Sequence, residues 1–505
     1  MEQQFKTVFN SCLNVLRDNE VLIGDNALRN ISYLLTLKLI EPQIDREIDL
    51  SQCVGFGDES HLSKEHWSKL LEISRFSVLK NEKEENLHNN ITLLWEYVLS
   101  KHRSTEKIFL PNKNFEITKD STFKRIIEHL DKLDLANIDF DLLGDAYTKN
   151  LEENMKGKVL GQFFTPPKIK SLMMELIVPQ IYEDGTFESC CDPTLGTGGF
   201  LITYLKYVKK QAKAKNIKLN WSKLCDTYLL FGKEIEPSTY QLAMSNILIS
   251  TGHIFSKMEL GDSIREPITQ KFDNVMANPP FGIKGLNYDE IKSRLRNEYL
   301  PIKSNNAVSL FLQAIIYMLK INGKCAIVLP DGQDLYSKTN RALVAVREYL
   351  LKTCDLKEII FLPGGLFEFT SIKTCIFFFV KRKEGREALE TVVKYNSSQK
   401  EVSRQYKFNR EHTTKSVKFY NYDFESKSKN LIVEVEIHDL EKNGYALNYS
   451  EYVGEKSSSD SEIVERGRNE EFEYEVKTLG EICEINYGKS ITKTQLIYNK
   501  ILNLI

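Results

Sequence analysis

The sequence predicts an α/β fold, in which a doubly wound and largely parallel sheet follows an all-α N-terminal domain. Apolar residues recur at helical spacing in the first part of the chain, for example over 27–41 and 89–102. From about residue 161, short β-branched or aromatic runs alternate with helical segments, which is typical of a doubly wound sheet. The last two runs are joined only by residues 364–372, too few for a crossover helix, so we expect an antiparallel hairpin at the sheet edge.

Seven runs are expected to form the strands of this sheet. In chain order they cover residues 187–192, 228–234, 257–262, 272–280, 323–330, 356–363 and 373–381. The predicted domains are a helical N-terminal domain (1–150), the sheet domain (151–455), an acidic linker (456–476) and a short structured tail (477–505).

Composition limits the class of protein. Hydrophobic residues make up 42% of the 505 residues, which is enough for a sizeable core and excludes general disorder. The 68 Lys and Arg residues nearly balance the 70 Asp and Glu residues, so net charge neither requires nor excludes a nucleic-acid partner. The nine cysteines form no CxxC pair, and we expect no metal site. No apolar stretch reaches the roughly 18 residues of a membrane span, so a cytoplasmic protein with no membrane partner is expected.

An acidic residue follows each of the first three predicted strands. Asp192 opens a turn that contains Gly196, Gly198 and Gly199, and glycines allow backbone to pass close to a ligand. A carboxylate there repels a pyrophosphate and attracts a cation such as the ammonium of S-adenosylmethionine. Glu234 can accept hydrogen bonds from ribose hydroxyls, and Asp262 from an adenine amino group. Three acids at successive strand ends predict one ligand crevice.

The segment 272–282 contains the most specific motif, Asn-Pro-Pro-Phe at 278–281. An exocyclic base amine is a poor nucleophile, because its lone pair is delocalised into the ring. The side-chain carbonyl of Asn278 and the main-chain carbonyl of Pro279 can accept both amine hydrogens and free that lone pair. Pro279 and Pro280 stiffen the loop, and Phe281 offers a face on which an extruded base can stack. We therefore assign catalysis to residues 278–281.

Six motifs occur in the order found in amino-group DNA methyltransferases of the gamma arrangement. They are GQFFTPP (161–167), DPTLGTGGF (192–200), GKEIEP (232–237), GDS (261–263), NPPF (278–281) and LPDG (329–332). Over roughly residues 10–455 the chain resembles the modification subunit of type I restriction-modification systems, an N6-adenine DNA methyltransferase family. One departure is Thr194-Leu195, where that family commonly has Ala-Cys.

The resemblance implies a Rossmann-like, seven-stranded methyltransferase sheet with S-adenosyl-L-methionine as cofactor. It adds to the cofactor site Gln162, Phe163, Phe164, Thr165, Pro166, Pro167 and Thr197. It also implies double-stranded DNA, a specificity subunit, a restriction subunit and a second copy of the chain as partners. The N-terminal domain is expected to help clamp DNA. The tail 477–505 resembles the start of a target-recognition segment of a specificity subunit.

The resemblance thus implies methylation of the N6 amine of adenine in DNA, at a site that a specificity subunit chooses and that is thereby protected from restriction. Two alternatives stay open. One is the same chemistry on another amine, namely cytosine N4, RNA or a protein glutamine. The other is a decayed, non-catalytic subunit that serves in DNA binding or assembly.

Overall fold

Helices make up the regular structure of the first part of the chain. The structure, a computed structural model, describes residues 2–111, 113–134, 139–154, 164–282, 286–367, 372–385, 389–397 and 401–453. The helices up to residue 154 are α1 (Glu2–Glu20), α2 (Gly24–Ile44), α3 (Lys64–Ile73), α4 (Phe76–Leu79), α5 (Leu87–Leu93), α6 (Asp120–Asp131) and α7 (Phe140–Asn154). The described residues of this part contain no strand, so the prediction of a helical N-terminal region is confirmed.

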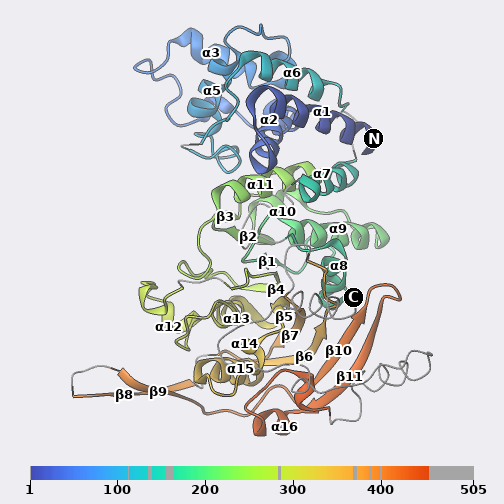
Figure 1. Ribbon diagram of the computed structural model, residues 1–505. Helices are drawn as coiled ribbons and strands as arrows, with labels where there is room; N and C mark the ends of the chain where they lie inside the picture. Colours follow the sequence, from blue (N-terminus) through green and yellow to red (C-terminus); the bar gives the residue numbers. More distant parts are fainter. Residues whose placement is uncertain are drawn as a thin grey trace, which may run out of the picture. The chain divides into compact units, whose positions relative to one another are not determined.

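A nine-stranded sheet follows (Figure 1). Its strands are β1 (Cys190–Asp192), β2 (Leu230–Glu234), β3 (Met258–Leu260), β4 (Phe272–Ala277), β5 (Leu319–Pro330), β6 (Cys354–Phe361), β7 (Thr374–Lys381), β10 (Ser416–Asp423) and β11 (Ser428–Glu436). Their order is β11-β10-β6-β7-β5-β4-β1-β2-β3. The five strands from β3 to β5 in this order pair in parallel, so the carboxyl ends of β1 to β4 meet at one edge. The prediction of a mainly parallel α/β sheet is confirmed.

The predicted hairpin is present, and its position differs in one respect. β7 pairs antiparallel with both β5 and β6, as a short connection requires. The sheet continues beyond β6, because β10 pairs in parallel with β6 and antiparallel with β11. The hairpin therefore lies inside a sheet of nine strands rather than at the edge of one of seven. β11 is mostly exposed and rich in charge, and it carries only a weak strand pattern.

Helices connect and cover these strands. They are α8 (Pro167–Ile177), α9 (Gly199–Ala214), α10 (Trp221–Asp226), α11 (Pro237–Thr251), α12 (Arg296–Tyr299), α13 (Ala307–Met318), α14 (Gln333–Tyr336), α15 (Arg341–Thr353) and α16 (Ile437–Lys442). α9 packs on β1 and β2, α11 on β2 and β3, α13 on β5 and α15 on β6. β8 (Leu389–Tyr395) and β9 (Glu401–Phe408) form a separate two-stranded sheet. In the described part of the chain, no helix has the length and apolar character needed to cross a membrane.

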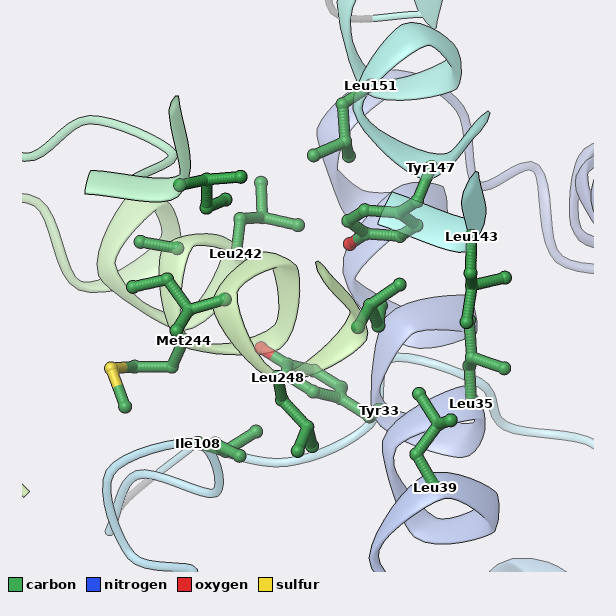
Figure 2. Packing of buried hydrophobic residues seen from close by; sticks show 14 of the residues in the cluster. Tyr33, Leu35, Leu39, Ile108, Leu143, Tyr147, Leu151, Leu242, Met244 and Leu248 are labelled. Atoms are coloured by element: carbon green, nitrogen blue, oxygen red, sulfur yellow. The ribbon is translucent and has the colours of Figure 1, made fainter. Parts of the chain in front are cut away.

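An apolar seam joins the helical region to the sheet region. Figure 2 shows side chains of α2, α7 and α11 that meet there, among them Leu35, Leu143, Tyr147 and Leu248. A Cβ added to Gly144 of α7 would lie 2.6 Å from the Cα atom of Ser250, which belongs to α11. The two helices are therefore in contact at this glycine. The seam is continuous with the core of the sheet.

The described residues up to Tyr449 belong to one compact unit. The predicted boundary near residue 150 lies inside this unit and within helix α7 (Phe140–Asn154), and it stays a prediction. The predicted linker (456–476) and tail (477–505) lie outside the described residues.

Candidate active site

A cavity of about 470 Å³ opens at the carboxyl ends of β1 to β4. It lies where β1 has β2 on one side and β4 on the other, which is the switch point at which open α/β sheets bind ligands. The predicted residues that line it are Phe164, Thr165, Asp192, Gly196, Thr197, Gly199, Glu234, Asp262, Asn278 and Pro280. The predicted residues that are described but do not line it are Pro166, Pro167, Gly198, Pro279 and Phe281. Gln162 and Phe163 lie outside the described residues.

Asp192, at the end of β1, is fully buried. Its Oδ1 atom accepts hydrogen bonds from the backbone N–H of Thr194 (3.0 Å) and from the Thr194 hydroxyl (3.2 Å). Its Oδ2 atom is buried and has no hydrogen-bond partner among the described residues. Burial raises the pKa of Asp192 to about 7, because the carboxylate loses its hydration. The cavity thus has an open acceptor that a cationic N–H donor would satisfy.

Glu234, at the end of β2, is held by backbone donors. Oε2 accepts from the N–H of Gly196 (2.9 Å), and Oε1 accepts from the N–H of Glu236 (3.0 Å). Burial raises the pKa of this carboxyl group above its ordinary value. Each carboxylate oxygen has two acceptor positions, so the group as a whole keeps capacity for a ligand hydroxyl. This geometry suits a vicinal diol.

The carboxylate of Asp262, after β3, already accepts three hydrogen bonds within the chain, which the sequence did not indicate. Oδ1 accepts from the backbone N–H groups of Ile264 (2.8 Å) and Arg265 (3.0 Å). Oδ2 accepts from Nη1 of Arg265 at 2.7 Å. One acceptor position on Oδ2 remains for an amino group. Arg265 also lines the cavity.

Gly198 lies outside the cavity lining, and its predicted place in the cofactor site stays a prediction. Its φ is +82°, a left-handed conformation that favours glycine, and it precedes the first residue of α9. An added Cβ would lie 3.1 Å from the Ile247 side chain of α11, away from the cavity lining. Gly198 is therefore required for chain direction and helix packing. Gly196 and Gly199 are the glycines of the turn that line the cavity.

Asn278, directly after β4, has a fixed orientation. Its Nδ2 atom donates to the hydroxyl of Thr165 at 3.0 Å. This bond directs Oδ1 elsewhere, and Oδ1 is buried without a partner among the described residues. Because Asn278 lines the cavity, it presents an unused acceptor to a bound molecule. The acceptor that the sequence analysis proposed for a base amine is thus available.

Phe281 packs beside the cavity and not in its lining. Its ring meets Phe367 edge to face, with centroids 6.4 Å apart and planes at 84°. The aromatic residues in the lining are Phe164, Phe200 and Phe311. The role of Phe281 as a stacking face for a base therefore stays a prediction.

Several lining residues were missed by the sequence analysis. The charged ones are Lys170, Lys233, Glu236 and Arg265, and the aromatic ones are Phe200 and Phe311. Phe200 ends the motif DPTLGTGGF, so its adjacency to the glycines was an available signal. Lys233 is 5% exposed and pairs with Glu266 at 3.0 Å. Nothing in the sequence marks such a lysine as buried. No group of three or more potential metal ligands occurs in the described ranges.

The family model described as N-6 DNA Methylase matches residues 138–461. The methylase subunit of the type I restriction enzyme EcoEI from Escherichia coli is 26% identical over 390 residues, which cover 75% of this chain and 76% of that protein. The methylase subunit of the type I restriction enzyme HindI from Haemophilus influenzae is 31% identical over 250 residues, which cover 48% of this chain and 52% of that protein. The chain thus spans about three quarters of the first relative and about half of the second.

Solved structures show the same fold. The methyltransferase subunit of a type I restriction-modification system from Streptococcus thermophilus has a TM-score of 0.60 at 19% identity, over 90% of this chain and all of that one. A modification subunit of a type I restriction enzyme from Vibrio vulnificus has a TM-score of 0.56 at 20% identity, over 90% of this chain and 91% of that one.

Proposed function

Because the chain belongs to the N-6 DNA Methylase family, we propose that it transfers a methyl group from S-adenosylmethionine to the N6 amine of adenine in DNA. The observation that carries this proposal is the pair of unsatisfied buried acceptors in one cavity, Oδ2 of Asp192 and Oδ1 of Asn278. An unsatisfied buried acceptor is costly, so two in one cavity indicate two donor-bearing ligands or groups.

The donor set of the cavity fits S-adenosylmethionine. Asp192 would accept from the ammonium of the methionine part, and Glu234 from the ribose hydroxyls. Asp262 keeps one acceptor position for the adenine amino group. The cofactor supplies an electrophilic methyl group on a positively charged sulfur.

Residues of the chain would then make the target amine reactive. Oδ1 of Asn278 accepts one N6 hydrogen, while Thr165 keeps the amide from rotating. The Pro279 carbonyl accepts the second hydrogen, and Phe281 stacks on the extruded base. Acceptors that favour a pyramidal amine stabilise the transition state more than the ground state.

The proposed partners follow from the relatives, which are type I methylase subunits. We propose that double-stranded DNA, a specificity subunit, a restriction subunit and a second copy of the chain assemble with this one. In this arrangement, the N-terminal domain (1–150) helps to clamp DNA, and the sheet domain (151–455) performs methyl transfer. The acidic segment (456–476) acts as a linker. The tail (477–505) resembles a target-recognition segment. The methylated site is protected from restriction, and the protein acts in the cytoplasm.

The test combines binding with product identification. Titration calorimetry should show saturable binding of S-adenosylmethionine to the purified chain. The chain and a cognate specificity subunit are then incubated with DNA and methyl-labelled cofactor, and the digested nucleosides are analysed by mass spectrometry. N6-methyladenine is the expected product. N4-methylcytosine as the only product would contradict adenine specificity, and cofactor binding without any methylated nucleoside would favour a non-catalytic subunit.

A further inference from the structure

Lys170 places a buried ammonium group in the wall of the cavity, where the proposed reaction gives it no role. The residue belongs to α8, and its side chain is only 9% exposed. It lines the same cavity as Asp192 and Asn278. Its ion-pair partner is Glu152 of α7, at an N–O distance of 3.7 Å. A buried charge is costly unless it is well paired, and this separation is long for a hydrogen-bonded ion pair.

Lys170 lies beside the first turn of α9, and its charged neighbours are Glu152, Asp145 and Lys206. A Cβ added to Gly199, the first residue of α9, would lie 3.2 Å from Nζ of Lys170. The first turn of a helix carries partial positive charge and disfavours a neighbouring cation. Burial removes water from the Lys170 ammonium and thereby lowers its pKa. The same loss of hydration raises the pKa of Asp192. An anion at this position would relieve both the buried ammonium and the helix end.

The turn from β1 to α9 therefore has a site for a cation at its start and a site for an anion at its end. Asp192, at its start, has an open acceptor for a cation. Lys170, beside Gly199 at its end, is placed to bind an anion. A free α-amino acid group carries an ammonium and a carboxylate on one carbon atom, so it can satisfy both within one short span.

We propose that Lys170 binds the α-carboxylate of the methionine part of the cofactor and thereby selects a ligand with a complete amino-acid end. This inference rests on the proposed function, because it takes S-adenosylmethionine as the cofactor. Lys170 is a binding and specificity residue, and it takes no part in methyl transfer itself. Glu152 holds the ammonium in place when the carboxylate is not bound.

The competing explanation is a structural ion pair that ties α8 to α7. A purely structural lysine would affect all ligands of the cavity alike. A carboxylate-binding lysine affects only ligands that carry the carboxylate. Comparing two ligands on one protein sample separates these explanations, because any unfolded fraction cancels in the ratio of the affinities.

The two probes are S-adenosylhomocysteine and its decarboxylated analogue, 5′-deoxy-5′-(3-aminopropylthio)adenosine, measured by titration calorimetry. The unmodified chain should prefer S-adenosylhomocysteine by roughly tenfold to hundredfold, as expected for a buried hydrogen bond between charged groups. In Lys170→Met this preference should fall to about one, through loss of affinity for S-adenosylhomocysteine alone. Lys168→Met, an exposed lysine of the same helix, should keep the full preference. Lys170→Gln is the second variant if the methionine variant does not fold.

Each other result has a defined meaning. Equal weakening of both ligands in the Lys170 variants, or an unmodified chain without preference, overturns the inference and leaves the proposed function standing. An unmodified, folded chain that binds neither ligand overturns the cofactor assignment, and the inference falls with it.

Discussion

The apolar seam and the candidate active-site cavity differ in the hydrogen bonding of their buried polar atoms. In the seam, the Ser32 and Tyr147 hydroxyls bond to each other, and the amide of Gln241 donates to the carbonyl of Ile108 at 3.1 Å. In the cavity, Asp192 and Asn278 each keep one buried oxygen without a partner among the described residues. The two seam pairs named here are satisfied within the chain, whereas the two cavity oxygens are open to a ligand.

The difference indicates where function lies. An unsatisfied buried acceptor costs about 1–3 kcal/mol, and a ligand in an adjoining cavity can offset that cost. Under the proposed function, the seam residues stabilise the fold and the two cavity oxygens bind ligands at a cost in stability. The following predictions test this division, in order of expected effect.

Asn278→Ala should lower the rate of methyl transfer by about 10² to 10³-fold, as removal of a group that stabilises developing charge typically does. Affinity for S-adenosylhomocysteine should change little, because Asn278 is assigned to the target amine. Single-turnover transfer and titration calorimetry measure the two effects. The exposed Asn81→Ala is the matched control. An equal loss of transfer and cofactor affinity would contradict the assignment.

Gly144→Ala should reduce the free energy of unfolding by about 1–3 kcal/mol. Its new Cβ would lie 2.6 Å from the Ser250 Cα, so α7 must move away from α11. At an ordinary position inside a helix, the same change stabilises by about 1 kcal/mol, so the sign is diagnostic. Denaturant unfolding measures it, with Gly364→Ala as a control in open space. Unchanged or increased stability would show that the seam is looser than described.

Asp192 should make cofactor binding depend on pH. Because its pKa is about 7 without ligand, the carboxylate is partly protonated at neutral pH. Affinity for S-adenosylhomocysteine should therefore rise between about pH 6 and 8, approaching tenfold per unit at the acidic end. Asp192→Asn should bind weakly and lose this dependence. A wild-type affinity that is constant over this range would contradict the role of the carboxylate.

The same group should affect stability with the opposite sign. Its folded-state pKa lies above the ordinary value of 3.8, so the folded chain holds the proton more tightly than the unfolded chain. The resulting stabilisation is complete below about pH 4 and is lost as the pH rises through about 7. The ligand-free Asp192→Asn variant should thus melt at a higher temperature than the unmodified chain at pH 8, and thermal scans at several pH values test this.

Thr165→Val should have the smallest effect, a roughly threefold to tenfold loss of transfer rate, because it removes one neutral hydrogen bond to Asn278. Thr165→Ser keeps the hydroxyl and should recover most of the rate. If Thr165→Ser loses as much activity as Thr165→Val, the hydroxyl alone does not account for the role of Thr165.

The mainly parallel sheet and the place of the crevice could be predicted from residues alone. Asp192, Glu234 and Asp262 each follow a short apolar run, and parallel strands bring their carboxyl ends together. The short apolar runs therefore predicted that three acids far apart in the sequence lie close together. The short connection 364–372 implied an antiparallel pair for a similar geometric reason.

The sequence by itself thus determined the parallel part of the sheet, the hairpin and the meeting of the three acids at one crevice, because these depend on patterns within a few residues. Only the tertiary structure decided that Lys170 is buried against Gly199 and that Gly198 packs on Ile247. It also decided that Arg265 donates a hydrogen bond to the Asp262 carboxylate. It also decided that β10 and β11 extend the sheet beyond the hairpin. Each of these features depends on which distant residues meet, and burial changes the chemistry of a charged side chain only after that meeting has occurred.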